Sequence, residues 1–296
     1  MQGEEPDMPE FDRAAEDIGN IVGLEHVNTR VPDQQLAVAF YIMGLGLTRD
    51  PYLVTGTVNM WVNVGRSQFH LPTGQAQVLR GHTGLVIPGR SELLNRLELV
   101  KDQLQGTQFS FAEAEDHVAV TCPWGNQIRC YEPNPQFPGL NLGMPYVQLD
   151  VPAGSAAAIA RFYQVYLGAP SQVREIDSGL CASVVVGADQ ELRFAERSGE
   201  QREFDGHHIA IYIADFSGPH GRLLEKGLIT QESNQHQYRF VDIVDPANGA
   251  PVFKLEHEVR SMRHPLYGRA QINRNPAITN ITYATGHEDM AWAVMD

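Results

Sequence analysis

Two adjacent histidines, His207 and His208, open the short apolar stretch GHHIAIYIAD at residues 206–215. In a half-buried β-strand consecutive side chains point to opposite faces, so only one of these imidazoles can face a pocket. A neutral imidazole in a pocket can bind a metal ion or transfer a proton. The elements around the pair decide which of the two is placed to do so.

The strand pattern of this stretch recurs along the chain. GLEHVNTRVPD at 23–33 and GMPYVQLDVPA at 143–153 alternate apolar and polar residues up to Val-Pro, and a helical pattern containing Phe-Tyr follows each. GHTGLVIPG at 81–89 opens a weaker copy, and the stretch at 206–216 opens a fourth. After each copy the period changes to about 3.6 and then back to short strand patterns, which predicts four βαβββ units.

The units are expected to pair, because a single unit would leave one face of its sheet exposed. We predict an α+β fold with two domains, at 20–135 and 143–260, separated by a linker rich in Pro and Asn. Residues 1–19 are acidic and are expected to form a flexible tail. Residues 261–296 are expected to form an irregular C-terminal extension that acts as a strap, a dimer contact or a lid.

This arrangement resembles the vicinal oxygen chelate superfamily, which includes glyoxalases, bleomycin resistance proteins and type I extradiol dioxygenases. The resemblance covers about four fifths of the chain, and four units in one chain are most similar to the extradiol dioxygenases. It implies curled mixed β-sheets around a cleft with a divalent metal. The ligands would come from the first strand of each unit and the last strand of a domain.

The register of the repeat assigns the first-strand positions that this resemblance implies. Each lies seven residues before the end of its strand, and the four residues there are His26, His82, Tyr146 and His208. In this register His208 faces the cleft and His207 faces away. Tyr212 shares the face of His208 and is a candidate catalytic hydrogen-bond donor.

The last-strand ligand differs between the two halves of the chain. In GNQIRCYE the family's glutamate position is held by Arg129, a cation that would repel a divalent metal. In PVFKLEHE the best match is Glu256, which shares a face with Lys254 and Glu258. Glu256 could instead pair with Lys254 or Arg260 at the surface.

We therefore expect the metal site in the second half of the chain. Its ligands would be Tyr146, His208 and Glu256, with Gln148 as an alternative contact and Gln148 and Lys254 as substrate-binding residues. A site in the first half would instead use three imidazoles, those of His26, His70 and His82.

The function implied is that of a metal-dependent oxidoreductase similar to extradiol ring-cleavage dioxygenases, with Fe(II) as the favoured metal. Mn, Zn, Ni or Co are alternatives. The substrate would be a small catechol-like or other oxygen-chelating molecule, with dioxygen as the second reactant. A glyoxalase-like lyase or isomerase, and a non-catalytic protein that sequesters a small ligand, are the alternative functions.

Composition restricts the partners. The net charge of −14 and the pI of about 5.2 disfavour binding to nucleic acid or to an anionic membrane. No apolar run is long enough to span a bilayer, and the N-terminus lacks the pattern of a signal peptide. Three widely spaced cysteines without a CxxC pair indicate reduced thiols in a cytoplasmic protein, and a homo-oligomer stays open.

Overall fold

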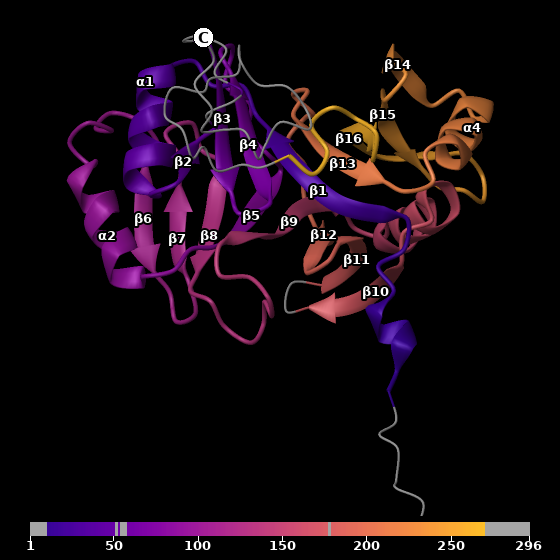
Figure 1. The fold of residues 1–296 in the computed structure, drawn as a ribbon, viewed down its shortest axis with the longest axis horizontal. Coiled ribbons are helices and arrows are strands. Elements are labelled where there is room, and N and C mark those ends of the chain that lie inside the picture. Colours follow the sequence, from indigo (N-terminus) through magenta and orange to yellow (C-terminus); the bar gives the residue numbers. More distant parts are fainter. Residues whose placement is uncertain (1–10, 51–52, 54–57, 177–178, 270–296) are drawn as a thin grey trace, which may run out of the picture.

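The computed structural model of the chain describes residues 11–50, 53, 58–176 and 179–269. Four βαβββ units follow one another in this part of the chain, as the repeats predict. A short 3₁₀-helix, η1 (Arg13–Glu16), precedes them and projects away from the sheets (Figure 1). Residues 1–10 of the expected tail lie outside the described residues.

The first two units have the same order of elements. The first contains β1 (Ile21–Asn28), α1 (Gln34–Ala37) with its π-helical continuation η2 (Val38–Gly44), β2 (Thr48–Arg49), β3 (Asn59–Val64) and β4 (Ser67–Pro72). The second contains β5 (Gly81–Val86), α2 (Arg90–Leu99), β6 (Ser110–Glu113), β7 (Val118–Thr121) and β8 (Gln127–Tyr131).

The last two units repeat this order. The third contains β9 (Gly143–Pro152), α3 (Ala156–Phe162) with its π-helical continuation η3 (Tyr163–Leu167), β10 (Ser171–Ile176), β11 (Gly179–Gly187) and β12 (Gln190–Arg197). The fourth contains β13 (His208–Ile213), α4 (Ser217–Glu225), β14 (Ile229–Asn234), β15 (Gln237–Val244) and β16 (Pro251–Ser261).

Each β-sheet joins one unit from the first half of the chain with one from the second half. One eight-stranded sheet has the order β14-β15-β16-β13-β1-β4-β3-β2 and combines the fourth unit with the first. The other has the order β10-β11-β12-β9-β5-β8-β7-β6 and combines the third unit with the second. Both sheets are mixed, and they lie one above the other in Figure 1. The predicted domains, 20–135 and 143–260, each contain two units, whereas each sheet takes one unit from either range.

The two units of one half of the chain pack against each other through their helices. The backbone of Gly44 in η2 lies close to Val100 and Leu97 at the end of α2, which holds the first unit against the second. Arg222 of α4 donates two hydrogen bonds to the carbonyl oxygen of Tyr166 in η3, which links the third unit to the fourth. Each lobe in Figure 1 thus contains two consecutive units, while both sheets run across the two lobes.

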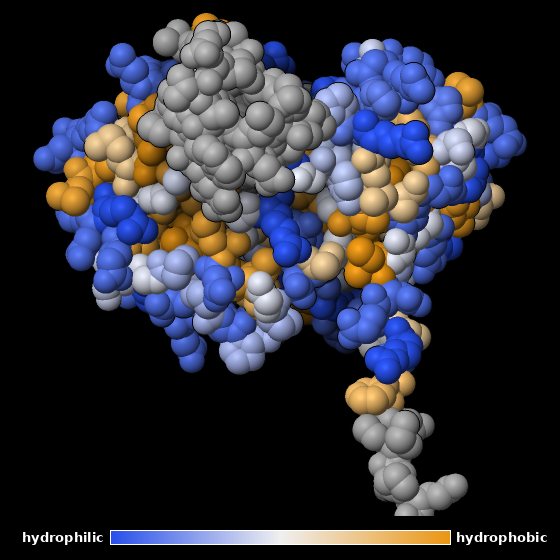
Figure 2. Space-filling model, viewed as in Figure 1, coloured by the Kyte–Doolittle hydropathy of each residue, from blue (hydrophilic) through white to orange (hydrophobic). Residues whose placement is uncertain are grey.

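The alternation of the strands separates a hydrophobic face from a polar one. Buried residues such as Leu24, Val27, Ile209 and Ile211 point into a core shared with the helices. In Figure 2 apolar side chains gather mainly in the middle of the visible face, and hydrophilic ones form its rim. The opposite, polar faces of the central strands carry the residues that could do chemistry.

No helix within the described residues combines the length and the apolar composition needed to cross a bilayer.

Candidate metal centre

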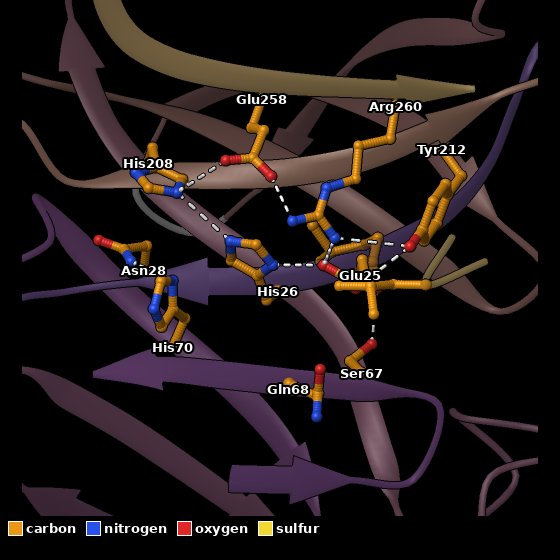
Figure 3. Close-up of polar contacts among 12 residues, drawn as sticks. Glu25, His26, Asn28, Ser67, Gln68, His70, His208, Tyr212, Glu258 and Arg260 are labelled. Atoms are coloured by element: carbon orange, nitrogen blue, oxygen red, sulfur yellow. Dashed lines mark hydrogen bonds and ion pairs between the residues drawn. The ribbon is translucent and has the colours of Figure 1, made fainter. Parts of the chain in front are cut away.

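Three histidines from three adjacent strands meet on the polar face of the first sheet (Figure 3). His26 lies on β1, His70 on β4 and His208 on β13, and their ligand nitrogens all lie within 4.8 Å of one another. We call these three residues the histidine cluster. Strand register brings them together, because Asn28 of β1 pairs with both His70 and His208. His207 points the other way and bonds Asp205, so the orientation inferred for the two adjacent histidines is the one observed.

His26 is fixed by the residue that precedes it. A register shift between Leu24 and His26 in the pairing with β13 lets Glu25 reach the polar face, where its carboxylate contacts His26 Nδ1. Tyr212 donates a hydrogen bond of 3.2 Å to Glu25, and Arg260 forms an ion pair of 2.7 Å with it. With the proton of His26 on Nδ1, the Nε2 lone pair is free to face the cluster.

The carboxylate of Glu25 stays ionised although it is buried. Burial opposes ionisation, but Arg260 and His26 together hold the pKa of Glu25 well below its usual value. A buried carboxylate that is always charged gives His26 a constant hydrogen-bond acceptor. The arrangement is that of a metal-ligating histidine supported by a carboxylate.

His70 presents a nitrogen without a partner. Its ring stacks on Trp61 at 3.8 Å, and its Nδ1 lies 2.7 Å from the side-chain amide of Asn28. The atom facing Nδ1 is the amide nitrogen Nδ2; with the amide turned over, its oxygen would accept the Nδ1 proton and Nε2 would carry the lone pair. His70 Nε2 is buried and has no hydrogen-bond partner among the described residues. Such an atom needs a ligand or water to satisfy it.

His208 completes the cluster beside a carboxylate. Its Nε2 lies 3.3 Å from His26 Nε2 and 3.6 Å from an oxygen of Glu258 on β16. Glu258 in turn forms ion pairs with Arg239 and, at 2.5 Å, with Arg260. A carboxylate thus stands next to the three imidazoles while two guanidinium groups balance its charge.

Burial keeps two of the imidazoles neutral. It lowers the pKa of His70 to about 2, with a further contribution from His26, and it lowers the pKa of His208 well below 6.5, helped by His26 and Arg239. Neutral imidazole is the form that binds a metal ion. The histidine cluster could therefore bind a divalent metal through three imidazole nitrogens, with the orphaned His70 Nε2 as the clearest sign of a missing partner.

Several residues expected near the metal lie elsewhere. Tyr146 and Gln148 are on β9 in the second sheet, where the Tyr146 hydroxyl bonds His82 Nε2 at 3.2 Å. Burial raises the pKa of Tyr146, so its phenol stays protonated and is a poor metal ligand. The expected group of Tyr146, His208 and Glu256 is therefore not formed, because the third and fourth units do not share a sheet.

On the last strand of the fourth unit, the carboxylate near His208 lies two residues beyond the predicted Glu256. Glu256 pairs in register with His208, but its carboxylate forms an ion pair with Arg239 at 2.6 Å. The carboxylate that approaches His208 belongs to Glu258, on the same face one step further along the strand. Lys254 is 61% exposed and lies 3.9 Å from Asp242, away from the cluster.

The alternative site proposed for the first half named two of the three clustered residues. His26 and His70 come together, whereas His82 lies in the second sheet and His208 takes the third place. Glu25 was missed, although it adjoins His26 in the sequence, because an alternating strand would turn it away. Only the irregular pairing of β1 brings it to the polar face.

A cavity of about 760 Å³ is lined by Glu25, which contacts His26, and by Tyr212, while the three histidines themselves are not among its lining residues. It lies between the two sheets and is covered on one side by the C-terminal residues 266–269. Arg269 from this segment forms a buried ion pair with Asp50. Residues 262–269 thus form an anchored strap at the cavity, and the remainder of the predicted extension lies outside the described residues.

Comparison with known proteins identifies the fold. No protein-family model matches the chain, and no curated protein matches it. Among solved structures, the chain is similar to a "putative dioxygenase" from Bacillus subtilis, at 15% identity, a TM-score of 0.55 and coverage of 83% of this chain and 86% of that one. It is also similar to glyoxalase I from Zea mays, at 14% identity, a TM-score of 0.55 and coverage of 80% and 92%.

The chain has the vicinal oxygen chelate fold. Four βαβββ units and two mixed eight-stranded sheets agree with the α+β fold that the repeats predict. Within this fold the first strands of two units and the last strand of one supply the histidine cluster. Identities of 14–15% show a shared fold, so the reaction must be argued from the residues of the cluster itself.

Proposed function

We propose that the protein is a metal-dependent enzyme that acts on a small substrate chelating the metal through neighbouring oxygen atoms. His26, His70 and His208 would hold the metal. The observation that carries this proposal is the convergence of three buried imidazoles, one of which has a nitrogen without a partner in the described chain. Three imidazole ligands are typical of catalytic metal sites that keep a position open.

The surroundings of the cluster favour an anionic substrate. The cavity beside Glu25 and Tyr212 has the size of an ordinary small-molecule pocket. Arg260 lies behind Tyr212, with its guanidinium group 6.0 Å from the ring centre. Its charge is balanced by Glu25 and Glu258, so a divalent metal on three neutral imidazoles would supply the positive charge. Burial raises the pKa of Tyr212, so its hydroxyl is a stable hydrogen-bond donor. A catechol-like molecule, which becomes an anion when it chelates, fits these features.

Among metal-dependent reactions we favour oxidative ring cleavage with Fe(II) and dioxygen. Imidazole ligands suit Fe(II), which when bound would supply positions for the substrate oxygens and for dioxygen. The protein residues would hold and orient the substrate: Tyr212 by turning its hydroxyl from Glu25 to the substrate, Arg260 by balancing charge, and Glu25 by fixing His26. Glu25 and Glu258 are both engaged by guanidinium groups, so neither is free to remove a proton from carbon.

A glyoxalase-like isomerase or lyase, with Zn, Mn, Ni or Co, is the second candidate. The observation that favours it is the position of Glu258, 3.6 Å from His208 and thus beside the metal ligands. If Glu258 left Arg239 and Arg260 when substrate binds, it could act as a general base. Dioxygen would then play no part.

The three cysteines of the chain, all buried and free, support the proposal that the protein works in a reducing compartment such as the cytoplasm.

Dioxygen consumption tests the proposal and separates the two candidates. Metal-free protein is loaded with Fe(II) under anaerobic conditions and then mixed with a panel of catechols in aerated buffer. We expect stoichiometric metal uptake and dioxygen consumption that depends on the catechol, both lost in His208→Ala and retained in His82→Ala. Metal uptake with turnover of an α-hydroxycarbonyl substrate in the absence of dioxygen would favour the isomerase. Failure to take up any divalent metal would exclude both.

A further inference from the structure

The second sheet repeats the geometry of the histidine cluster with different residues. In the first sheet, β1 pairs antiparallel with β13, and β4 and β16 pair parallel on either side. In the second, β5 pairs antiparallel with β9, and β8 and β12 take the outer places. The residues in positions equivalent to His26, His208, His70 and Glu258 are His82, Tyr146, Arg129 and Arg193. We call these four the arginine cluster.

Arg129 and Arg193 carry positive charge at the positions where the first sheet has His70 and Glu258. Arg129 pairs in register with Gly84 of β5, and Arg193 pairs with Gln148 of β9, so the two arginines flank the central strands. Burial, followed by the positive charges of Arg129 and Arg193, lowers the pKa of His82 to about 3. The surroundings of His82 are therefore electropositive in a chain whose net charge is −14. A divalent cation would be repelled here.

Both guanidinium groups keep N–H donors that form no hydrogen bond within the described residues. Arg193 stacks on the Tyr146 ring, with its Cζ 3.9 Å from the centroid, and donates through Nε to Glu191 at 2.8 Å. That contact leaves both terminal nitrogens of Arg193 outside the ion pair. Arg129 is exposed and forms neither an ion pair nor a hydrogen bond through its side chain within the part of the chain that the structure describes. The nearby carboxylates of Glu191 and Asp150 each have an arginine partner.

Gln148 supplies a second, independent sign of a ligand. It lies on the same face, between His82 on one neighbouring strand and Arg193 on the other. Only 8% of the residue is exposed, yet its side-chain amide has no hydrogen-bond partner among the described residues. The amide atoms of Gln148 are not among the fully buried unpaired atoms, so they reach solvent and Nε2 can donate a hydrogen bond to an incoming ligand.

We propose that the arginine cluster binds a small oxyanion, a carboxylate or phosphate group, between Arg129 and Arg193 with the Gln148 amide as a further donor. The buried end of this site is closed by aromatic residues, because Tyr131 bonds the Tyr146 hydroxyl at 2.9 Å and Phe137 of the linker packs on both tyrosines. The ligand therefore enters from the exposed side of Arg129. Guanidinium groups with a neutral amide donor suit the planar or tetrahedral oxygens of such anions.

Titration of the metal-free full-length protein with inorganic phosphate, sulfate and acetate tests the proposal. Isothermal titration calorimetry at low ionic strength should give saturable binding with one site per chain. The Kd should rise about fivefold or more in Arg129→Gln and in Gln148→Leu, because each removes a donor to the anion. Gln148→Glu, which keeps the shape and adds a negative charge, should weaken binding further. The tighter of phosphate and acetate identifies the source of the oxyanion.

Arg161→Gln is the matched control, because it also removes one arginine charge. Arg161 lies on α3, outside the second sheet, and forms an exposed ion pair with Asp245. The substitution should change the Kd less than about twofold, because surface charges are screened. Saturable binding of none of the three anions would overturn the proposal. So would unchanged binding in both Arg129→Gln and Gln148→Leu, or an equal loss in Arg161→Gln. Circular dichroism confirms that the variants are folded.

Discussion

The histidine cluster and the arginine cluster occupy equivalent positions in two sheets with the same strand arrangement. The first brings together three imidazoles and places Glu258 beside them. The second presents two guanidinium groups around His82 and Tyr146. The comparison teaches that the fold fixes where four side chains point, whereas the identity of those side chains decides whether the position suits a cation or an anion.

The neighbouring residues that orient the side chains of each cluster also differ. His26 and His70 each have a polar neighbour on Nδ1, Glu25 and Asn28, which orients the ring and leaves Nε2 toward the cluster. In the second sheet, Gly84 takes the place equivalent to Asn28, and the Tyr146 ring fills the space above it. The arginine cluster thus has no preorganised set of lone pairs within the described residues.

The largest expected effect is the loss of a ligand from only one of the two clusters. His208→Ala should weaken Co(II) or Zn(II) binding by roughly a thousandfold, more than the 10–100-fold typical of losing an outer partner. His82→Ala, at the equivalent position, should leave the affinity unchanged. Calorimetric titration of chelator-treated protein measures both. Similar losses in the two variants would break the comparison.

Removing the Phe137 ring, which packs on Tyr131 and Tyr146, should lower the stability of the fold without changing metal affinity. Phe137 is buried against Tyr131 and Tyr146, so Phe137→Ala should lower the free energy of unfolding by about 3 kcal/mol. Metal affinity should not change. Leu99→Ala, at a position that is 83% exposed, is the control and should cost less than about 0.5 kcal/mol. Urea denaturation provides the measurement, and an altered metal affinity in Phe137→Ala would show that the two clusters are coupled.

Glu25→Gln tests whether the Glu25 carboxylate orients His26. The amide cannot accept the His26 proton as strongly as a charged carboxylate and leaves Arg260 partly unpaired. We expect metal affinity to fall by about 10–100-fold, with nitrogen NMR showing a mixture of His26 tautomers in the metal-free protein. Tyr212→Phe, which removes only a hydrogen bond to Glu25, should fall well short of this. An unchanged tautomer and affinity would mean that Glu25 does not position His26.

The smallest expected effect concerns acid stability, which both clusters share. The pKa of His82 is about 3 in the folded protein and about 6.5 in the unfolded chain, so protons bind the unfolded state first as the pH falls below 6.5. Between pH 7 and 5.5 this costs about 1.3 kcal/mol of stability. His82→Gln should reduce the pH dependence by that amount. Urea denaturation at the two pH values would count against a neutral His82 if the dependence were the same in both proteins.

The sequence predicts the units, because Val-Pro and Phe-Tyr recur at matching places in 23–33 and 143–153 and their following helices. It also predicts that His208, and not His207, faces the site. It does not predict which units share a sheet, since local periodicity says nothing about which strand edges pair. For the same reason Tyr146 was expected beside His208 and lies in the other sheet.

Finer errors have local causes. Glu256 and Glu258 share one face of β16, so alternation alone cannot decide which of them approaches His208. The contact of Glu25 with His26 depends on an irregular strand pairing that no sequence pattern marks. The roles of Arg239 and Arg260 as partners of Glu258 likewise depend on tertiary packing.

Anomalous scattering from crystals of the metal-loaded protein, recorded on both sides of the metal absorption edge, tests the central contrast most directly. Our account predicts one strong peak per chain, bonded to His26, His70 and His208, and no peak at the arginine cluster. A peak beside His82 and Tyr146, or a metal held without the three histidines, would contradict it.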